Sequence, residues 1–107
     1  MLFRSGSWQG AESIDPEGVV GTSFPDIAID GSDAAHVVWR AGTPKKLFSS
    51  RYSAGSWQTT EEIGFGNWVA NSFPHIAVDS SGNAIAVWKE EIELEGAYNR
   101  IYANRYE

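Results

Sequence analysis

Hydrophobic residues occur in short runs along this chain, and turn-forming residues separate the runs. The clearest runs are Phe73–Asp79, Ala84–Lys89, Arg100–Tyr106 and Trp57–Ile63, each of strand length and bordered by Gly, Asn, Asp or Ser. A helical period is absent, and only Glu90–Gly96 is compatible with a turn of helix. The pattern predicts an all-β chain.

The run Ala84–Lys89 and its earlier counterpart "AHVVW" do not alternate apolar and polar residues. Successive side chains of a strand point to opposite faces of its sheet, so a strand with one solvated face would alternate. Both faces of these two strands are therefore expected to be covered.

The chain contains an internal duplication. After a shift of 49 residues, Phe3–Arg40 aligns with Tyr52–Lys89 without a gap, and "LFSSRY" later corresponds to "IYANRY" after about five extra residues in the second copy. The chain is thus predicted to be one unit, 1–107, made of repeat 1 (about 3–51) and repeat 2 (about 52–106). Identical pairs include Gly6/Gly55, Trp8/Trp57, Gln9/Gln58, Glu12/Glu61, Ile14/Ile63, Phe24/Phe73, Pro25/Pro74, Ile27/Ile76, Asp30/Asp79, Val38/Val87 and Trp39/Trp88.

Each repeat carries a tight turn that begins at an aspartate, Asp30 or Asp79. An Asp side chain at this position can accept hydrogen bonds from the backbone ahead of it. The turns supply too few carboxylates for a calcium loop, so they are expected to be structural. His36, which replaces Ile85 of the other copy, is expected to be a buried histidine with a hydrogen-bond partner.

A four-stranded antiparallel unit that is covered on both faces and repeated in tandem predicts a blade of a β-propeller. The expected fold is all-β, a β-propeller with two four-stranded antiparallel blades per chain. Propellers use roughly 4–8 blades, so the ring is expected to close by homo-oligomerisation, with a six-bladed trimer favoured. The alternative is that the chain is a fragment of a longer propeller.

The order of the predicted strands suggests how copies of the chain associate. The first strand, Trp8–Ile14, corresponds to Trp57–Ile63 and has no preceding strand to pair with, whereas the last blade lacks this outermost strand. Trp8–Ile14 of one copy is therefore expected to complete the last blade of the next copy and to cover its exposed edge.

Charge and composition exclude some classes of partner. A net charge of −6 and an isoelectric point near 4.8 argue against nucleic acid, and no apolar run is long enough to span a membrane. The chain has no cysteine, which excludes a disulfide scaffold and a cysteine zinc site. The compartment stays open, since an extracellular or periplasmic location would require a leader that has been removed.

The pattern "PHIAVDSSGNAIAVWK…IYANRY…GSWQ" resembles the repeat of bacterial sialidase-like (Asp-box-like) propeller proteins, over nearly the whole chain. The sialidase Asp-box itself runs Ser-x-Asp-x-Gly-x-x-Trp, and here Asp79 and Gly82 stand far from Trp88. The resemblance therefore implies the fold and not the enzyme. The predicted architecture is also similar to that of small two-repeat propeller lectins, which form six-bladed trimers.

The loops Asp15–Thr22 and Gly64–Asn71 are long and differ between the copies, and a scaffold carries function where its loops vary. Trp68 is the sharpest candidate because its counterpart is Val19. With Phe65 and Asn67 beside it, Trp68 could stack on a sugar ring. The alternative is that Trp68 packs over the edge of a blade.

A second candidate site lies between blades. There a tryptophan, an acid and a nearby arginine could line a sugar pocket, with core packing as the alternative. The residues concerned are Trp8, Trp57, Glu12, Glu61, Arg51 and Arg105.

No metal site or cofactor is expected. Asp26 and His75 share one position of the repeat and are the only weak metal candidates. A Ser–His–acid series, a phosphate loop and an HExxH motif are absent, so no catalytic residues are expected and the chain is not expected to be an enzyme. The function favoured is non-catalytic, lectin-like carbohydrate recognition. The alternative is a structural or protein-interaction scaffold.

Overall fold

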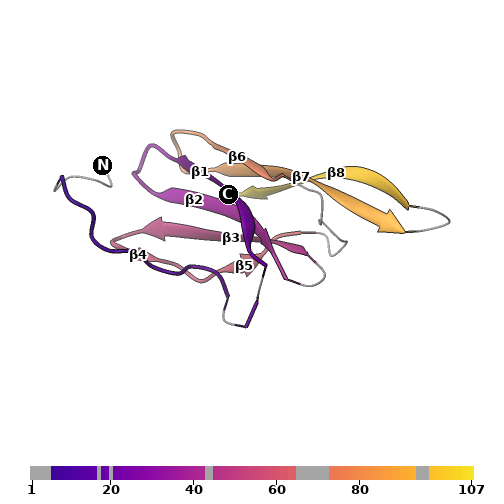
Figure 1. Ribbon diagram of the computed structural model, residues 1–107. Helices are drawn as coiled ribbons and strands as arrows, with labels where there is room; N and C mark the ends of the chain where they lie inside the picture. The colour runs from indigo at the N-terminus through magenta and orange to yellow at the C-terminus, as the bar shows by residue number, and fades with distance from the viewer. Residues whose placement is uncertain (1–5, 17, 20, 43–44, 65–72, 94–96) are drawn as a thin grey trace.

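The computed structural model describes residues 6–16, 18–19, 21–42, 45–64, 73–93 and 97–107 (Figure 1). In this part of the chain every regular element is a β-strand, and the strands form two antiparallel sheets. The prediction of an all-β chain is confirmed.

The first sheet is built from the first repeat and the start of the second. Its three long strands lie in the order β1-β2-β3, and two short strands pair with the far edge of β3. The strands are β1 (Ser23–Ile29), β2 (Ala35–Ala41), β3 (Lys46–Ser53), β4 (Ser56–Trp57) and β5 (Glu61–Glu62). The run predicted as one strand over Trp57–Ile63 is therefore two short pairings with an interruption between them.

The second sheet has the order β6-β7-β8, and all its pairings are antiparallel. Its strands are β6 (His75–Val78), β7 (Ala84–Glu93) and β8 (Ala97–Tyr106). The suggestion of a helical turn from Glu90 is wrong as far as Glu93, because β8 is long enough to pair with this segment and extends it as strand. Residues 94–96 of that prediction lie outside the described residues.

The two sheets place equivalent residues at equivalent positions, which agrees with the duplication. β1, β2 and β3 correspond to β6, β7 and β8, and the sheets stack with β1 beside β6 (Figure 1). Segment 6–16 precedes this arrangement and contains no strand among its described residues. Trp8 in this segment is 89% exposed.

The main core lies between the two sheets. Val38 and Leu47 of the first sheet pack there against Ala86 and Trp88 of the second. The burial of this apolar surface supplies the attraction that holds the sheets face to face. Ile63, Ile76 and Tyr102 complete the cluster from its margin.

A second cluster covers the outer face of the first sheet. Val37 and Trp39 of β2 are buried there, and Ile14 and Val19 from the preceding segment pack against them. β2 is thus covered on both faces, as its sequence predicts. β7 is covered on one face only, because its alternate residues, including Val87, are exposed on the outside of the second sheet.

The two aspartate turns have the geometry that the sequence predicts. Asp30 Oδ1 accepts hydrogen bonds from the backbone N–H groups of Ser32 (2.8 Å) and Ala34 (3.1 Å). Asp79 repeats these contacts in the second copy. The fourth residue of each turn has a positive φ, 64° at Asp33 and 89° at Gly82, and this left-handed backbone suits Asp or Gly better than other residues.

The twin turns differ in burial, and this difference predicts different mutational effects. Asp30 is buried, whereas Asp79 is exposed. We expect Asp30→Ala to lower the free energy of unfolding by about 2 kcal/mol, because it leaves the buried N–H of Ala34 without an acceptor. Asp79→Ala should lower the free energy of unfolding clearly less, since water can replace its carboxylate as the hydrogen-bond acceptor. Urea unfolding of both variants measures the difference, and equal losses would contradict the expectation.

The same turn should make stability depend on acid pH. Burial raises the pKa of Asp30, but the N–H of Ser32, the ring of His36 and the N–H of Ala34 outweigh it and hold the pKa below the ordinary 3.8. A carboxyl whose folded-state pKa is depressed contributes stability above its unfolded-state pKa, and that stability is lost as the pH falls through the folded-state value. We therefore expect the unfolding free energy to fall below about pH 4 and to fall less steeply in Asp30→Ala.

Candidate functional site

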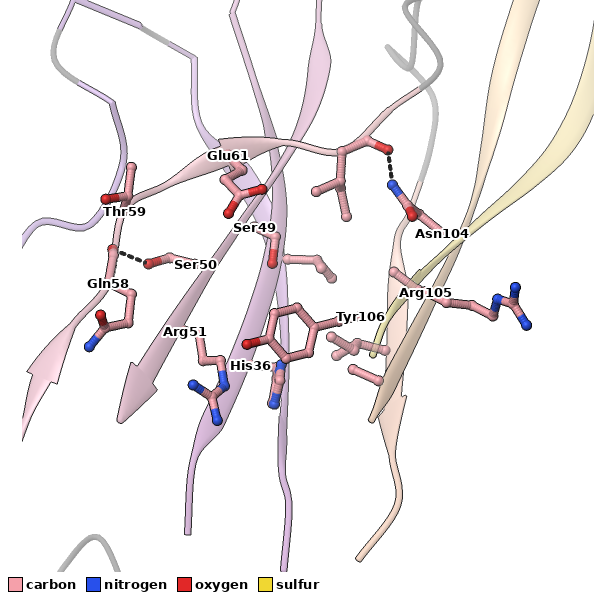
Figure 2. Close-up of a pocket in the computed structure, with 15 residues that line it drawn as sticks. His36, Ser49, Ser50, Arg51, Gln58, Thr59, Glu61, Asn104, Arg105 and Tyr106 are labelled. Atoms are coloured by element: carbon pink, nitrogen blue, oxygen red, sulfur yellow. Dashed lines mark hydrogen bonds between the residues drawn. The ribbon is translucent and has the colours of Figure 1, made fainter. Parts of the chain in front are cut away.

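A cavity of about 320 Å³ lies between the two sheets (Figure 2). β2 and β3 form one wall together with segment 58–63, and β6, β7 and β8 form the other. Because antiparallel strands alternate their side chains, every second residue of β3 and β8 faces this gap. Beyond the apolar core, the positions that face the gap carry polar residues, so the cavity has an apolar base and a polar lining.

Arg51 is the central charged group of the first wall. Its Nη1 donates to Ser53 Oγ at 3.1 Å, and its guanidinium carbon lies 5.3 Å from the centre of the Tyr106 ring. Arg51 Nε is buried and, in the described residues, has no hydrogen-bond partner. An unpaired buried donor is costly, and this one belongs to a side chain that lines the cavity.

Polar groups above Arg51 continue the same wall. Glu61 points into the space between the walls in Figure 2, near Ser49, and Gln58 and Thr59 lie beyond it. Ser50 Oγ donates to the backbone carbonyl of Gln58 at 3.1 Å, which fixes this segment against β3. The wall therefore presents a carboxylate and hydroxyl groups, whereas the Gln58 amide donates to the backbone carbonyls of Ser53 (3.1 Å) and Ser56 (3.3 Å).

The second wall presents an aromatic ring and an amide. Asn104 Nδ2 donates to the carbonyl of Ile63 at 3.0 Å and so ties β8 to the first sheet. Tyr106 projects towards Arg51 and His36 (Figure 2). Arg105 also borders the cavity, but its guanidinium points away from the other labelled side chains and lies 3.5 Å from Glu107.

His36 lines the cavity from β2. It is buried, its Nε2 lies 3.2 Å from Asp30 Oδ2, and its ring meets that of Tyr106 edge to face at 5.3 Å between centres. The prediction that His36 is buried with a partner is confirmed. Since Asp30 also caps the adjacent turn, the turn and the cavity share one hydrogen-bond network.

The sequence-predicted residues of the inter-blade pocket separate into two groups. Arg51, Glu61 and Arg105 line the cavity. Trp57 instead packs edge to face on Tyr52, 5.3 Å between ring centres, and supports the outer cluster of the first sheet. Trp8 and Glu12 lie in the exposed N-terminal segment and do not line the cavity.

The other predicted binding residues, Trp68, Phe65 and Asn67, lie outside the described residues. Val19, the counterpart of Trp68 in the first copy, packs against the cluster around Trp39. The cavity lies at the end of the sheets that carries the aspartate turns. The sequence predicts a binding surface on the loops Asp15–Thr22 and Gly64–Asn71, and most of the second loop lies outside the described residues.

Asp26 and His75 are neighbours across the two sheets, with His75 Nδ1 3.9 Å from Asp26 Oδ2. The same oxygen accepts a hydrogen bond from the backbone N–H of Ile76 at 2.9 Å. Within the described ranges, no group of three or more His, Cys, Asp or Glu side chains is placed to hold a metal ion. The pair links β1 to β6.

An aromatic group lies near the other end of the sheets. Phe24 has a positive φ of 56° at a bulge in β1, and its ring meets that of Phe73 at 4.5 Å. The guanidinium of Arg40 lies 4.1 Å from the centre of the Phe24 ring. These contacts connect the two repeats, and a cation against an aromatic face is favourable even when exposed.

Sequence reasoning missed several residues of the cavity, chiefly Tyr106, Gln58 and Asn104. Two of them carried a usable signal, because Gln58 repeats Gln9 and Tyr106 repeats Tyr52. A polar residue that occupies the same position in both repeats is a candidate for a binding surface that is present in each repeat. Asn104 replaces Ser50 and carried no such signal.

Comparison with known proteins finds no matching family model, no matching curated protein and no matching solved structure. The residues that the structure describes include no helix with the length and apolarity to span a membrane.

Proposed function

We propose that this protein is a non-catalytic binding module that holds a small carbohydrate in the cavity between its two sheets. The observation that carries the proposal is the presence of Arg51 and Glu61 on one side of the cavity and of the Tyr106 ring on the other. At about 320 Å³, the cavity is at the small end of the roughly 300–1,000 Å³ of ligand pockets, which suits one or two sugar rings.

The chemistry of the lining favours an uncharged polyhydroxyl ligand. Sugar hydroxyls both donate and accept, so they can pair with the carboxylate of Glu61 and with the guanidinium of Arg51 at once. The aromatic face of Tyr106 can cover the apolar face of a sugar ring. An anionic ligand would meet Glu61 and a chain whose net charge is −6.

The acid content of the cavity supports a binding role over a catalytic one. Glycoside hydrolysis generally uses two carboxyl groups that flank the scissile bond. Among the described residues that line the cavity, Glu61 is the single carboxylic acid. Asp30 is engaged by His36 and by its own turn.

We also propose that each sheet is one blade of a β-propeller. The two sheets repeat the same strand order, stack face to face, and lie with their equivalent first strands, β1 and β6, beside each other. Blades around a common axis require this arrangement, since the innermost strands of all blades gather at the axis.

A glycan array tests the carbohydrate proposal. We expect the wild-type chain to bind a restricted set of glycans, and Arg51→Ala to weaken binding roughly tenfold or more, because a hydrogen bond to a charged group is worth about 1.5–3 kcal/mol. Arg100→Ala is the matched control, since it removes the same charge from an exposed side chain that does not line the cavity. A blank array, or equal losses in both variants, would count against the proposal.

A second function, that of a protein-interaction scaffold, is favoured by one observation. The outer face of the second sheet exposes the apolar side chains of Ile85, Val87 and Ile101. Exposed apolar patches on soluble proteins commonly mark interaction sites. The scaffold function would be favoured if the chain bound no glycan on the array but bound a protein through this face.

A further inference from the structure

Two apolar surfaces face outwards on opposite sides of the stacked sheets. We name the outer face of the second sheet, formed by Ile85, Val87 and Ile101, the tail face. We name the outer face of the first sheet, formed around Ile27 and Trp39, the head face. Trp39 is already buried (2% exposed) in a cluster against which Ile14 and Val19 of the same chain pack, whereas Ile27 is 57% exposed.

The duplication shows what these two faces are built to contact. In the core between the sheets, Val38 and Leu47 of the first sheet pack against Trp88 and Ile76 of the second. This internal junction therefore has two unlike halves, one from each sheet.

Each half of the internal junction has a twin on an outward face. Val87 and Ile101 of the tail face are the repeat counterparts of Val38 and Leu47. The contrast in burial is large, because Leu47 is 0% exposed and Ile101 is 75% exposed.

The head face completes the correspondence. Ile27 and Trp39 are the counterparts of Ile76 and Trp88, which form the other half of the internal junction. The tail and head faces thus carry the two halves of a second junction of the same kind. They point away from each other across the sandwich, so the halves cannot meet within one chain.

The edges of the two sheets differ in the same way as their faces, since, in the part of the chain that the structure describes, one edge is covered and its counterpart is not. β4 and β5 pair with the edge of β3, with Trp57 opposite Tyr52 and Glu61 opposite Ser49. The equivalent edge of β8 has no strand paired with it among the described residues. The segment that corresponds to β4 and β5 is residues 7–13, which are exposed and form no strand.

We propose that the tail face of one copy of this chain binds the head face of a second copy, and that residues 7–14 of the second copy pair with β8 of the first. The pairing of β4 and β5 with β3 inside one chain gives the register in which residues 7–14 would pair with β8. Trp8 lies opposite Tyr106 and Glu12 opposite Ala103, as Trp57 lies opposite Tyr52 and Glu61 opposite Ser49.

The pairing of residues 7–14 with β8 is a strand addition, which explains why this segment takes part in the contact between copies. The N–H and C=O groups along the β8 edge gain partners, and the exposed edge is protected. Further along, Ile14 of the second copy takes the position of Ile63, whose N–H donates to the carbonyl of Leu47 at 2.9 Å. This inference extends the blade proposal and does not depend on carbohydrate binding.

Mass measurement in solution is the first test. We expect the chain at micromolar concentration to have the mass of two or more copies, and Ile101→Glu to shift it to the mass of one copy. Because Ile101 is exposed in the single chain, this variant should keep the circular dichroism spectrum of a β-protein. Ser56→Glu, on the exposed strand β4, is the matched control and should leave the mass unchanged.

Cysteine trapping tests the register independently, because the chain contains no cysteine of its own. We expect a variant that combines Glu12→Cys and Ala103→Cys to form chain-to-chain disulfides under mild oxidation. A variant that combines Glu12→Cys and Ser81→Cys should not. A wild-type mass of one copy would overturn the proposal, and so would a multimer that is unaffected by Ile101→Glu and is not trapped by the first cysteine pair.

Discussion

Replacing Trp88 with phenylalanine should lower the free energy of unfolding by about 3 kcal/mol, a large share of the roughly 5–15 kcal/mol that a domain possesses. Trp88 lies in the core between the sheets, and its Nε1–H donates to Glu90 Oε2 at 2.6 Å. Phenylalanine leaves space in the core and removes a donor from a fully buried carboxylate. Urea unfolding followed by circular dichroism, at one fixed chain concentration, measures the loss.

The first repeat contains the matched control for this prediction. Trp39 is the twin of Trp88 and is equally buried, but Ala41 stands where the second repeat has Glu90. In the described part of the chain, Trp39 Nε1 has no hydrogen-bond partner. Trp39→Phe should therefore cost only about 1 kcal/mol, from the loss of packing alone. The expectation fails if Trp39→Phe is as damaging as Trp88→Phe.

Leu47→Ala should be the other strongly destabilising substitution, with a loss of about 3–4 kcal/mol. Leu47 is fully buried at the centre of the junction between the sheets, where it packs with Val38, Ala86 and Trp88. Shortening its side chain opens a cavity between two sheets that cannot approach more closely, because the aspartate turns already bring Gly31 against the backbone of Ser80.

The control for Leu47→Ala keeps the volume of the side chain. Leu47→Met should cost less than about 1.5 kcal/mol, because methionine can fill nearly the same space. Thermal or urea unfolding of the two variants distinguishes lost packing from a general intolerance of change at this position. A loss in Leu47→Ala no larger than that in Leu47→Met would show that the junction is not the main core.

Periodicity and duplication were sufficient to predict the class of fold. The aspartate turns and the buried positions of Val38, Trp39 and Trp88 follow from local sequence, because turn residues and apolar runs act over a few residues. The segment from Glu90 was harder to assign. Its acidic residues favour no strand locally, and only the pairing with β8 makes it one.

The candidate site was predictable only in part. Arg51 and Glu61 were identified because an acid and an arginine near a tryptophan are typical of a sugar pocket. Tyr106 and His36 join them through the stacking of two sheets, and a contact between sheets leaves no local pattern in the sequence. Trp57 does not line the cavity, because its ring packs on Tyr52 and against the outer cluster of the first sheet.

The unlike character of the head and tail faces has a consequence for symmetry. Neighbours joined through two different surfaces cannot be related by a twofold axis, and each added subunit leaves the same free surface for the next. The angle between the two sheets inside one subunit therefore decides whether growth ends in a closed cycle or continues as a fibre. A closed cycle would always contain an even number of sheets.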